Sequence, residues 1–250
     1  MISLIARGSD VDETNRALLT DCVLVGIPKP KTTKLRPLAM GEALLKLAGS
    51  IAVSGSLEAL QEKFASLQYG LKKAGTEEII NEARAYINDP SNSEHCIVTI
   101  DCENAFNSIF RTCISEAVRD PAFRNLAPLF DLCYSRPSRL LVRNPDMCWT
   151  IIPSTQGGRQ GDSCMPAFFC LGIHSILQAI ADRHNIVIKA YLDDITIYGG
   201  VASCTEATLE IEQMLKDIGL IINRTKSHVY GTNYWLSTSA PEGSKSWEHG

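Results

Sequence analysis

The sequence lacks paired cysteines. Its nine cysteines show no Cys-x-x-Cys spacing and no zinc-type grouping with the five histidines. This absence argues against a structural zinc site and against a disulfide framework. An odd number of cysteines fits reduced thiols in a reducing compartment. We therefore expect an intracellular protein.

A long hydrophobic run is also missing. No apolar stretch reaches the roughly 18 residues that a membrane span needs, and the N-terminus shows no signal-peptide pattern. The hydrophobic content of 45% and the mean hydropathy of −0.01 are typical of a soluble globular protein. With 250 residues, the chain is long enough to bury a large core in one or two lobes. The sequence predicts no membrane partner.

Basic residues are not in excess. The chain has 24 Lys and Arg against 28 Asp and Glu, and its net charge is −4. This balance argues against a wide nucleic-acid-binding surface. The basic residues do form two clusters. Each cluster could contact nucleic acid or could equally be an ordinary solvated surface. The first cluster lies beside two prolines, and the second has helix-like spacing; they comprise Lys29, Lys31, Lys34 and Arg36, and Arg136, Arg139 and Arg143.

Two adjacent carboxylates, Asp193 and Asp194, are the most informative feature that is present. They follow Tyr191 and Leu192 and lie between two β-rich runs, so the pattern predicts a hairpin with Asp-Asp at its turn. Asp-Asp is also common in solvated surface turns. Carboxylates crowded at one turn repel each other and are stabilised by a cation or a proton. The hard cation Mg²⁺, which prefers carboxylate oxygens, is the obvious candidate.

A second acidic position supplies a partner for this pair. The apolar run at residues 95–100 predicts a buried strand that ends in Asp101, and a helix is expected from Asn104 to about Val118. A single Asp at this place is often only a helix cap. One carboxylate at a strand end and another on a neighbouring hairpin form the arrangement that holds two divalent ions for nucleotidyl transfer.

Several segments resemble the motifs of reverse transcriptases, in the same order, over residues 20–231. Within this family, the segments most resemble those of retrotransposons without long terminal repeats. The five matching motifs are Leu35-Arg36-Pro37-Leu38, Asp101 to Ser108, Gly158 to Asp162 with Pro166, Tyr191 to Asp194, and Gly219-Leu220 with Asn223 to Lys226. The short step Gln68-Tyr69-Gly70 adds to the resemblance. Five motifs in one order are far more specific than any single motif. Ser163 departs from the family, which usually has Pro there.

The resemblance implies RNA-templated DNA synthesis from deoxynucleoside triphosphates, with two Mg²⁺ ions, or Mn²⁺, as cofactors. The expected partners are an RNA template and a DNA or RNA primer. Asp101 and Asp193 are the expected metal ligands and Asp194 supports them; these three and Lys226 form the predicted catalytic set. Lys226 would neutralise or protonate the pyrophosphate leaving group.

The predicted nucleotide-binding residues also follow from the resemblance. Arg36, with Lys29 or Lys31, would hold the triphosphate. Phe106 would block the 2′-hydroxyl of a ribonucleotide, although a core Phe at a helix start is the ordinary alternative. Gln160 and Gly161 would lie under the nucleotide and the template base, and Tyr191 beneath the primer terminus.

The predicted fold is α+β: the fingers and palm of a right-hand polymerase. Strands and helices are expected in an order that gives a split β-α-β-β-α-β palm. The fingers are expected at residues 1–95 and 121–156, the palm at 96–120 and 157–231, and a disordered tail at 232–250. Helices are expected at 41–60, 76–87, 166–184 and 205–216, and strands at 22–27, 138–142 and 220–230.

After the last palm strand, too few residues follow for a thumb, so the sequence resembles a fingers–palm core or a fragment of a longer retroelement protein. Further domains or a subunit would supply a thumb and an endonuclease. Three alternatives remain: a relic that binds RNA without catalysis, an RNA-templated RNA polymerase, and a nucleotide cyclase. Phe106 and the Leu35-Arg36-Pro37 step argue against the last two. A nuclear location is expected only by analogy with chromosomal retroelements.

Overall fold

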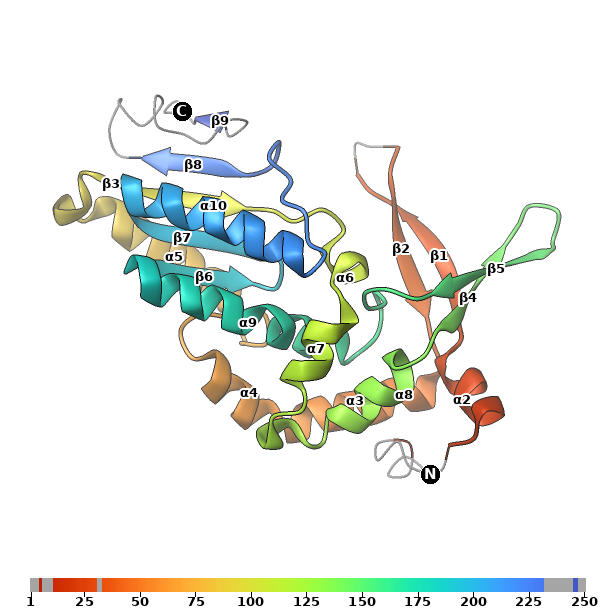
Figure 1. The fold of residues 1–250 in the computed structure, drawn as a ribbon. Helices are drawn as coiled ribbons and strands as arrows, with labels where there is room; N and C mark the ends of the chain where they lie inside the picture. The colour runs from red at the N-terminus through yellow and green to blue at the C-terminus, as the bar shows by residue number, and fades with distance from the viewer. Residues whose placement is uncertain (1–4, 6–10, 31–32, 232–244, 247–250) are drawn as a thin grey trace. The chain divides into compact units, whose positions relative to one another are not determined.

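The computed structural model describes residues 5, 11–30, 33–231 and 245–246. The chain forms two compact units (Figure 1). Unit 1 comprises Met1–Leu60 and Phe106–Gly172, and unit 2 comprises Gln61–Ala105 and Ile173–Gly250. These bounds are not those of the expected fingers and palm segments, so that division of the chain stays a prediction.

Unit 1 is built on a four-stranded sheet in the order β2-β1-β4-β5. β1 (Cys22–Pro28) and β2 (Leu35–Met40) form an antiparallel hairpin, and β4 (Ser138–Arg143) and β5 (Trp149–Ser154) form another. The two hairpins are joined by only two parallel pairs, Cys22 with Leu140 and Val23 with Leu141, so they separate beyond those residues (Figure 1).

The helices of unit 1 share a buried core. Leu126, Leu129, Phe130 and Phe168 are fully buried there, and Phe130 meets Phe168 edge to face with 5.3 Å between the ring centroids. The helices are α2 (Glu13–Thr20), α3 (Ala43–Gly55), α6 (Ala105–Ser108), α7 (Arg111–Ala117), α8 (Ala127–Tyr134), the short η2 (Pro121–Phe123), and the beginning of α9 (Met165–His184).

Unit 2 is a five-stranded sheet in the order β6-β7-β3-β8-β9. Its strands are β3 (His95–Ile100), β6 (Val187–Tyr191), β7 (Asp194–Gly200), β8 (His228–Gly231) and β9 (Lys245–Ser246). Together with α9 and α10 (Val201–Asp217), the first four form the predicted β-α-β-β-α-β order, which is confirmed. The helix α4 (Leu57–Phe64) lies at the boundary between the units.

Both faces of the β3 strand are covered, which explains why its sequence is mainly apolar, with Cys96, Ile97 and Val98 all buried in succession. α9 and α10 lie on one face (Figure 1), where Cys96 of β3 meets Cys204 of α10. On the other face lies α5 (Gly75–Asn88), which the short η1 (Pro90–Asn92) follows. There the Tyr198 hydroxyl donates to the Ile79 carbonyl over 3.4 Å. These contacts hold the sheet in position. The last residue of β3 and the first residues of β7 then lie side by side at the same end of the two strands.

Most predicted elements are present, with four corrections. The helix expected from Asn104 to Val118 is broken into α6 and α7, because Ile109 and Phe110 are not helical. The helix expected at 41–60 ends at Gly55, and the chain bends by 58° into α4. β5 was not expected. Around residue 222, only an isolated bridge between Ile222 and Cys102 replaces the expected strand. The expected tail lies outside the described residues, except for β9.

One helix is long and apolar enough for a membrane span, although the sequence predicts no apolar stretch of that length. By length and composition, α9 has 20 residues and a mean hydropathy of 1.3 over 18 of them, enough to cross a membrane. However, 61% of that window is buried inside the protein, as in the core helix of a soluble domain. Together α3 and α4 pass the same test only as a bent pair.

Candidate functional site

The sheet of unit 2 brings the three predicted carboxylates to one edge. Ile100 is the last residue of β3 and pairs with Ile195 of β7. The register therefore sets Asp101 beside Asp194 at the adjacent ends of the two strands. Asp193 precedes Asp194 in the turn that joins β6 to β7, and Tyr191 ends β6 opposite Asp194. A hairpin turn next to a strand end thus collects side chains that lie almost 100 positions apart in sequence.

The carboxylates interact electrostatically. Partial burial raises the pKa of Asp193 to about 6, and the charges of Asp194 and Asp101 act in the same direction, opposed by a backbone hydrogen bond and Lys226. Loss of hydration and the charge of Asp101 raise the pKa of Asp194 as well. The neighbouring charges therefore disfavour ionisation of Asp193 and Asp194, which is the behaviour of groups that a cation stabilises.

The loop after α10 wraps around Asp101. The Asn223 amide donates to the Asp101 carbonyl over 2.7 Å, and the Asp101 amide donates to the Ser227 hydroxyl over 3.3 Å. The Lys226 ammonium lies 3.1 and 3.2 Å from the two carboxylate oxygens of Asp101. The motif Asn223 to Lys226 thus contacts the first catalytic motif directly, and Lys226 is paired with Asp101 in this arrangement.

Gln68 holds the turn that carries Asp193. Its side-chain oxygen accepts the amide N–H groups of Leu192 and Gly70 over 2.9 and 3.0 Å, and its side-chain nitrogen donates to the Leu192 carbonyl over 3.3 Å. Gln68 is buried. Leu192 has φ of 59°, a left-handed conformation that is unfavourable for a leucine and that the two-sided clamp stabilises.

Gly70 leaves room for this clamp. A β-carbon at Gly70 would lie 2.5 Å from the Leu192 side chain and 3.1 Å from its backbone nitrogen. In the sequence, Gln68-Tyr69-Gly70 is recognisable only as part of a resemblance, and nothing there predicts a role for Gln68. The one available signal was a polar Gln in an otherwise apolar stretch.

The donor chemistry of this edge fits a hard divalent cation. Asp101, Asp193 and Asp194 offer only carboxylate oxygens, the ligands that Mg²⁺ prefers. As the side chains lie, however, no three His, Cys, Asp or Glu residues of the described part of the chain form a ready-made metal-binding group. The ammonium of Lys226 occupies one side of Asp101, so any cation that binds there competes with it.

Unit 1 contains the predicted nucleotide-binding residues. Arg36 lies exposed on β2 and Lys29 directly follows β1. The carbonyl of Gln160 accepts the amide of Ala39 on β2 over 2.8 Å, which fixes the loop that contains Gly161 against this hairpin. Gly161 has φ of 106°, a conformation that favours glycine.

Phe106 is tied to the same loop. Its ring stacks on that of Phe169 with 4.9 Å between the centroids, and its carbonyl accepts the Gly158 amide over 2.7 Å. A β-carbon at Gly157 would lie 2.2 Å from the Asn107 carbonyl oxygen, so the two segments are in direct backbone contact. Phe106 is half-buried and part of a packed aromatic pair.

A partly buried cluster of charged residues that contacts this loop was not anticipated from the sequence. The ring of Tyr134 has the guanidinium of Arg111 at 5.1 Å and that of Arg159 at 5.0 Å from its centroid. Its hydroxyl donates to the Asp162 carboxylate over 2.5 Å. Arg111 also donates to the Gly157 carbonyl over 2.8 Å. Burial and the Asp162 charge hold the pKa of Tyr134 well above its usual value.

The structure therefore groups the predicted residues by unit. Asp101, Asp193, Asp194, Lys226 and Tyr191 belong to unit 2, whereas Arg36, Lys29, Phe106, Gln160 and Gly161 belong to unit 1. The individual roles given to these residues stay predictions.

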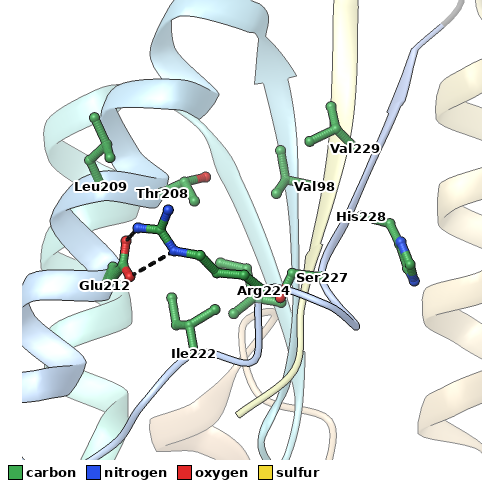
Figure 2. Close-up of a pocket in the computed structure, with 10 residues that line it drawn as sticks. Val98, Thr208, Leu209, Glu212, Ile222, Arg224, Ser227, His228 and Val229 are labelled. Carbon is green, nitrogen blue, oxygen red and sulfur yellow. Dashed lines mark hydrogen bonds and ion pairs between the residues drawn. The ribbon is translucent and has the colours of Figure 1, made fainter. Parts of the chain in front are cut away.

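A separate pocket in unit 2 contains none of these residues. It lies between α10 and the strands β3 and β8, and its lining is mainly apolar, from residues such as Val98, Leu209 and Ile222 (Figure 2). The side chains of Arg224 and Glu212 meet across it, with 2.6 Å between Nη2 and Oε2.

Comparison with known proteins identifies the family. Residues 27–239 match the family described as reverse transcriptase (RNA-dependent DNA polymerase). The chain belongs to the reverse transcriptase family. The prediction made from the motif order is thereby confirmed.

Similar proteins agree with this assignment. The chain is 28% identical, over 78% of its length, to the retrotransposable element SLACS 132 kDa protein of Trypanosoma brucei gambiense. It spans only 16% of that relative, about one sixth of its length.

Solved structures show the same fold. Apo telomerase of Candida tropicalis, truncated from its C-terminal domain, has a TM-score of 0.62 at 14% identity, over 84% of this chain and 49% of that chain. Telomerase of Candida albicans, in complex with a fragment of telomeric RNA, has a TM-score of 0.64 at 10% identity, over 87% of this chain and 44% of that chain. The α+β fingers–palm fold predicted from the sequence is confirmed.

Proposed function

We propose that this reverse transcriptase chain adds deoxynucleotides to a primer on an RNA template, as the fingers–palm core of a longer retroelement protein. The observation that best supports this proposal is that the strand register brings Asp101, Asp193 and Asp194 together at one edge of the unit 2 sheet. The mutual effect of these charges on the pKa of Asp193 supports a shared task for them.

Asp101, Asp193 and Asp194 would hold the Mg²⁺ ions. When bound, such ions activate the attacking hydroxyl and neutralise the charge of the triphosphate. Gln68 keeps the turn of Asp193 in place, and the loop of Asn223 does the same for Asp101. Lys226 pairs with Asp101 in the structure and would be the residue that neutralises or protonates the pyrophosphate leaving group.

Phe106 is proposed to select the sugar. Its stacking on Phe169 fixes the ring, and a fixed ring excludes a 2′-hydroxyl better than a mobile one. Exchange of Phe106 for Val should raise ribonucleotide incorporation relative to deoxynucleotide incorporation by about tenfold or more, since one steric contact is typically worth 1–3 kcal/mol. Competition between the two nucleotides in a primer-extension assay measures this ratio. An unchanged ratio would remove the role given to Phe106.

Single-nucleotide extension of a DNA primer on an RNA template tests the proposed function. With Mg²⁺ or Mn²⁺, we expect the 250-residue chain to add one matched deoxynucleotide, and Asp193→Asn to lose more than about 100-fold in rate. The loss should exceed that figure because even the outer partners of a metal site typically contribute 10–100-fold.

Asp217→Asn is the matched control, because Asp217 ends α10 and is exposed. It should retain the wild-type rate. Addition that survives in Asp193→Asn would contradict the proposed site. RNA binding without any addition by the wild type would instead identify a relic that has kept the architecture and lost the chemistry.

A further inference from the structure

Lys189 is a buried lysine at the centre of β6 that the proposed site does not use. The residue is 9% exposed. Side chains two positions apart on a strand share a face, so Lys189 lies on the same face as Tyr191, which pairs with Asp194 at the start of β7. A buried ammonium is costly unless it is paired, so its partners indicate its role.

The ammonium of Lys189 joins three segments of unit 2. It donates to the Tyr69 hydroxyl over 2.7 Å and lies 2.9 Å from one carboxylate oxygen of Glu82 on α5. The Tyr69 hydroxyl donates to the other carboxylate oxygen of Glu82 over 3.4 Å. We call Lys189, Tyr69 and Glu82 the lysine triad. Burial acts to lower the pKa of Lys189, but these hydrogen bonds outweigh it and hold that pKa above its usual value, so the group stays charged.

Tyr69 has little freedom in this position. It is 2% exposed, and a β-carbon at Gly75, the first residue of α5, would lie 2.5 Å from the Tyr69 carbonyl oxygen. The start of α5 is thus in close contact with the backbone of Tyr69. Further along the same helix, Glu82 contacts its hydroxyl. The helix therefore holds both the backbone and the end of the side chain of this residue.

The backbone next to Tyr69 forms only one bridge with β6. The Tyr69 amide donates to the Ala190 carbonyl, and the Ala190 amide donates to the Leu67 carbonyl, each over 2.7 Å. Gln68 pairs with Ala190 between these two bonds. A single bridge is far shorter than an ordinary strand pairing, so side-chain contacts are needed to hold this segment firmly.

Gln68 and Tyr69 direct their side chains to different partners. Neighbouring side chains at a β-bridge point to opposite faces. The Tyr69 side chain ends at the other two members of the lysine triad, whereas the Gln68 side chain bonds the backbone of Leu192 in the turn of Asp193. The first contact holds the segment, and the second holds the turn.

A buried ion pair that only stabilised the fold could be replaced by apolar residues with little loss. A methionine at position 189 would fill similar space but could not hold the Tyr69 hydroxyl. We propose that Lys189 is a positioning residue: through Tyr69 it keeps Gln68 on the turn that carries Asp193. This rests on the proposed function, in which that turn carries a catalytic carboxylate.

Hydrogen exchange of the Leu192 and Gly70 amides, which both donate to the Gln68 side chain, measures this link without any catalysis. In the full 250-residue chain, Lys189→Met should speed exchange at both amides by about fivefold or more, as expected when a hydrogen bond is weakened. Tyr69→Phe should do the same, because it removes only the hydroxyl that Lys189 binds. It keeps the aromatic ring, so it still tests the proposal if Lys189→Met does not fold.

Single-nucleotide addition tests the consequence for the reaction. Lys189→Met and Tyr69→Phe should each lower the maximal rate by about tenfold and leave the KM for the deoxynucleotide within about twofold, because a small displacement of a catalytic group slows the chemical step. A contact that merely stabilised the fold would leave both values unchanged in folded samples. If Lys189 acts through Gln68, Lys189→Met combined with Gln68→Ala should be no slower than Gln68→Ala alone.

Two matched controls lie in unit 2. Tyr198→Phe removes another buried hydroxyl that contacts α5, at a place away from the lysine triad. Lys72→Met removes another ammonium that lies 5.1 Å from the centre of the Tyr69 ring, one that pairs with Glu78. Both variants should keep the exchange and the addition of the wild type. Thermal melting checks that each variant is folded.

Unchanged exchange at Leu192 in both Lys189→Met and Tyr69→Phe would overturn the proposal. So would equal effects in the controls, or losses of rate that multiply when Lys189→Met and Gln68→Ala are combined. Faster exchange in a chain that adds no nucleotide would keep the link from Lys189 to the turn and refute the proposed function alone.

Discussion

Two loops carry residues proposed for nucleotide addition, and their backbones are held in opposite ways. In unit 2, the turn of Asp193 is clamped by the neutral amide of Gln68. In unit 1, the loop of Gln160 is held by charged groups, with the Arg111 and Arg159 guanidinium groups 5.1 and 5.0 Å from the centre of the Tyr134 ring and a carboxylate at its hydroxyl.

The difference follows from what each loop has to present. A charged clamp beside Asp193 would either neutralise the carboxylates or repel a cation from them, whereas an amide fixes the turn and leaves its charge unchanged. The loop of Gln160 presents backbone and amide groups, so buried cations beneath it do not compete with a bound metal. They also add positive potential under a loop that is proposed to meet a triphosphate.

The largest effect is expected at the charged cluster. Arg159→Met leaves the partly buried Asp162 without its cationic neighbour and the Thr20 carbonyl without its hydrogen-bond donor. Breaking a buried charge network in this way should lower the free energy of unfolding by about 3–5 kcal/mol. Urea denaturation followed by circular dichroism measures it.

Arg119→Met provides the comparison for this variant. Arg119 pairs with Asp131 over 2.6 Å, but both side chains are largely exposed. An exposed pair contributes about 0–1 kcal/mol, so this variant should stay close to the wild type. Similar losses at Arg159 and Arg119 would show that the cluster does not support the loop.

A smaller effect is expected at the neutral clamp. Gln68→Ala leaves the amides of Leu192 and Gly70 without their acceptor, which should cost about 1–3 kcal/mol of unfolding free energy. Because the turn carries Asp193, the rate of nucleotide addition should fall more than the stability does. Urea titration and single-nucleotide extension on the same samples separate the two effects.

Gln213→Ala is the control for the clamp, since the Gln213 side chain donates to an exposed carboxylate, that of Asp217.

The variant Gln68→Glu tests whether the clamp must be neutral. It keeps an acceptor for the two amides and places a negative charge beside the turn. If the clamp must be neutral, this variant should be better folded than Gln68→Ala and still impaired in addition; normal addition would contradict the argument.

The sequence predicted the parts of the site that are local and missed those that are distant. Asp101, Asp193 and Asp194 could be placed because each adjoins a recognisable strand, and strand order then brings their edges together. The clamp joins Gln68 to Leu192, 124 residues apart. The cluster joins Arg159 to Thr20, 139 residues apart. The hydrophobic periodicity of a sequence does not predict contacts between residues that lie so far apart.

The ends of the helices were the other feature that the sequence did not predict correctly. The run from Asn104 to Val118 has helical composition, yet the chain breaks at Ile109 and Phe110. Ile109 is fully buried at that break. Tertiary burial outweighed the local preference for a continuous helix, as it often does for short segments. The β5 strand was missed because its apolar residues do not alternate with polar ones.

The central claim is that carboxylates from two motifs act as one catalytic centre. Single-turnover addition of one deoxynucleotide by the wild type, Asp101→Asn, Asp193→Asn and the double variant tests it most directly. Residues that act as a unit give strongly non-additive losses. The account predicts that each single variant falls to the background rate and that the double variant is no slower. Independent losses that multiply in the double variant, or addition that persists in either single variant, would contradict it.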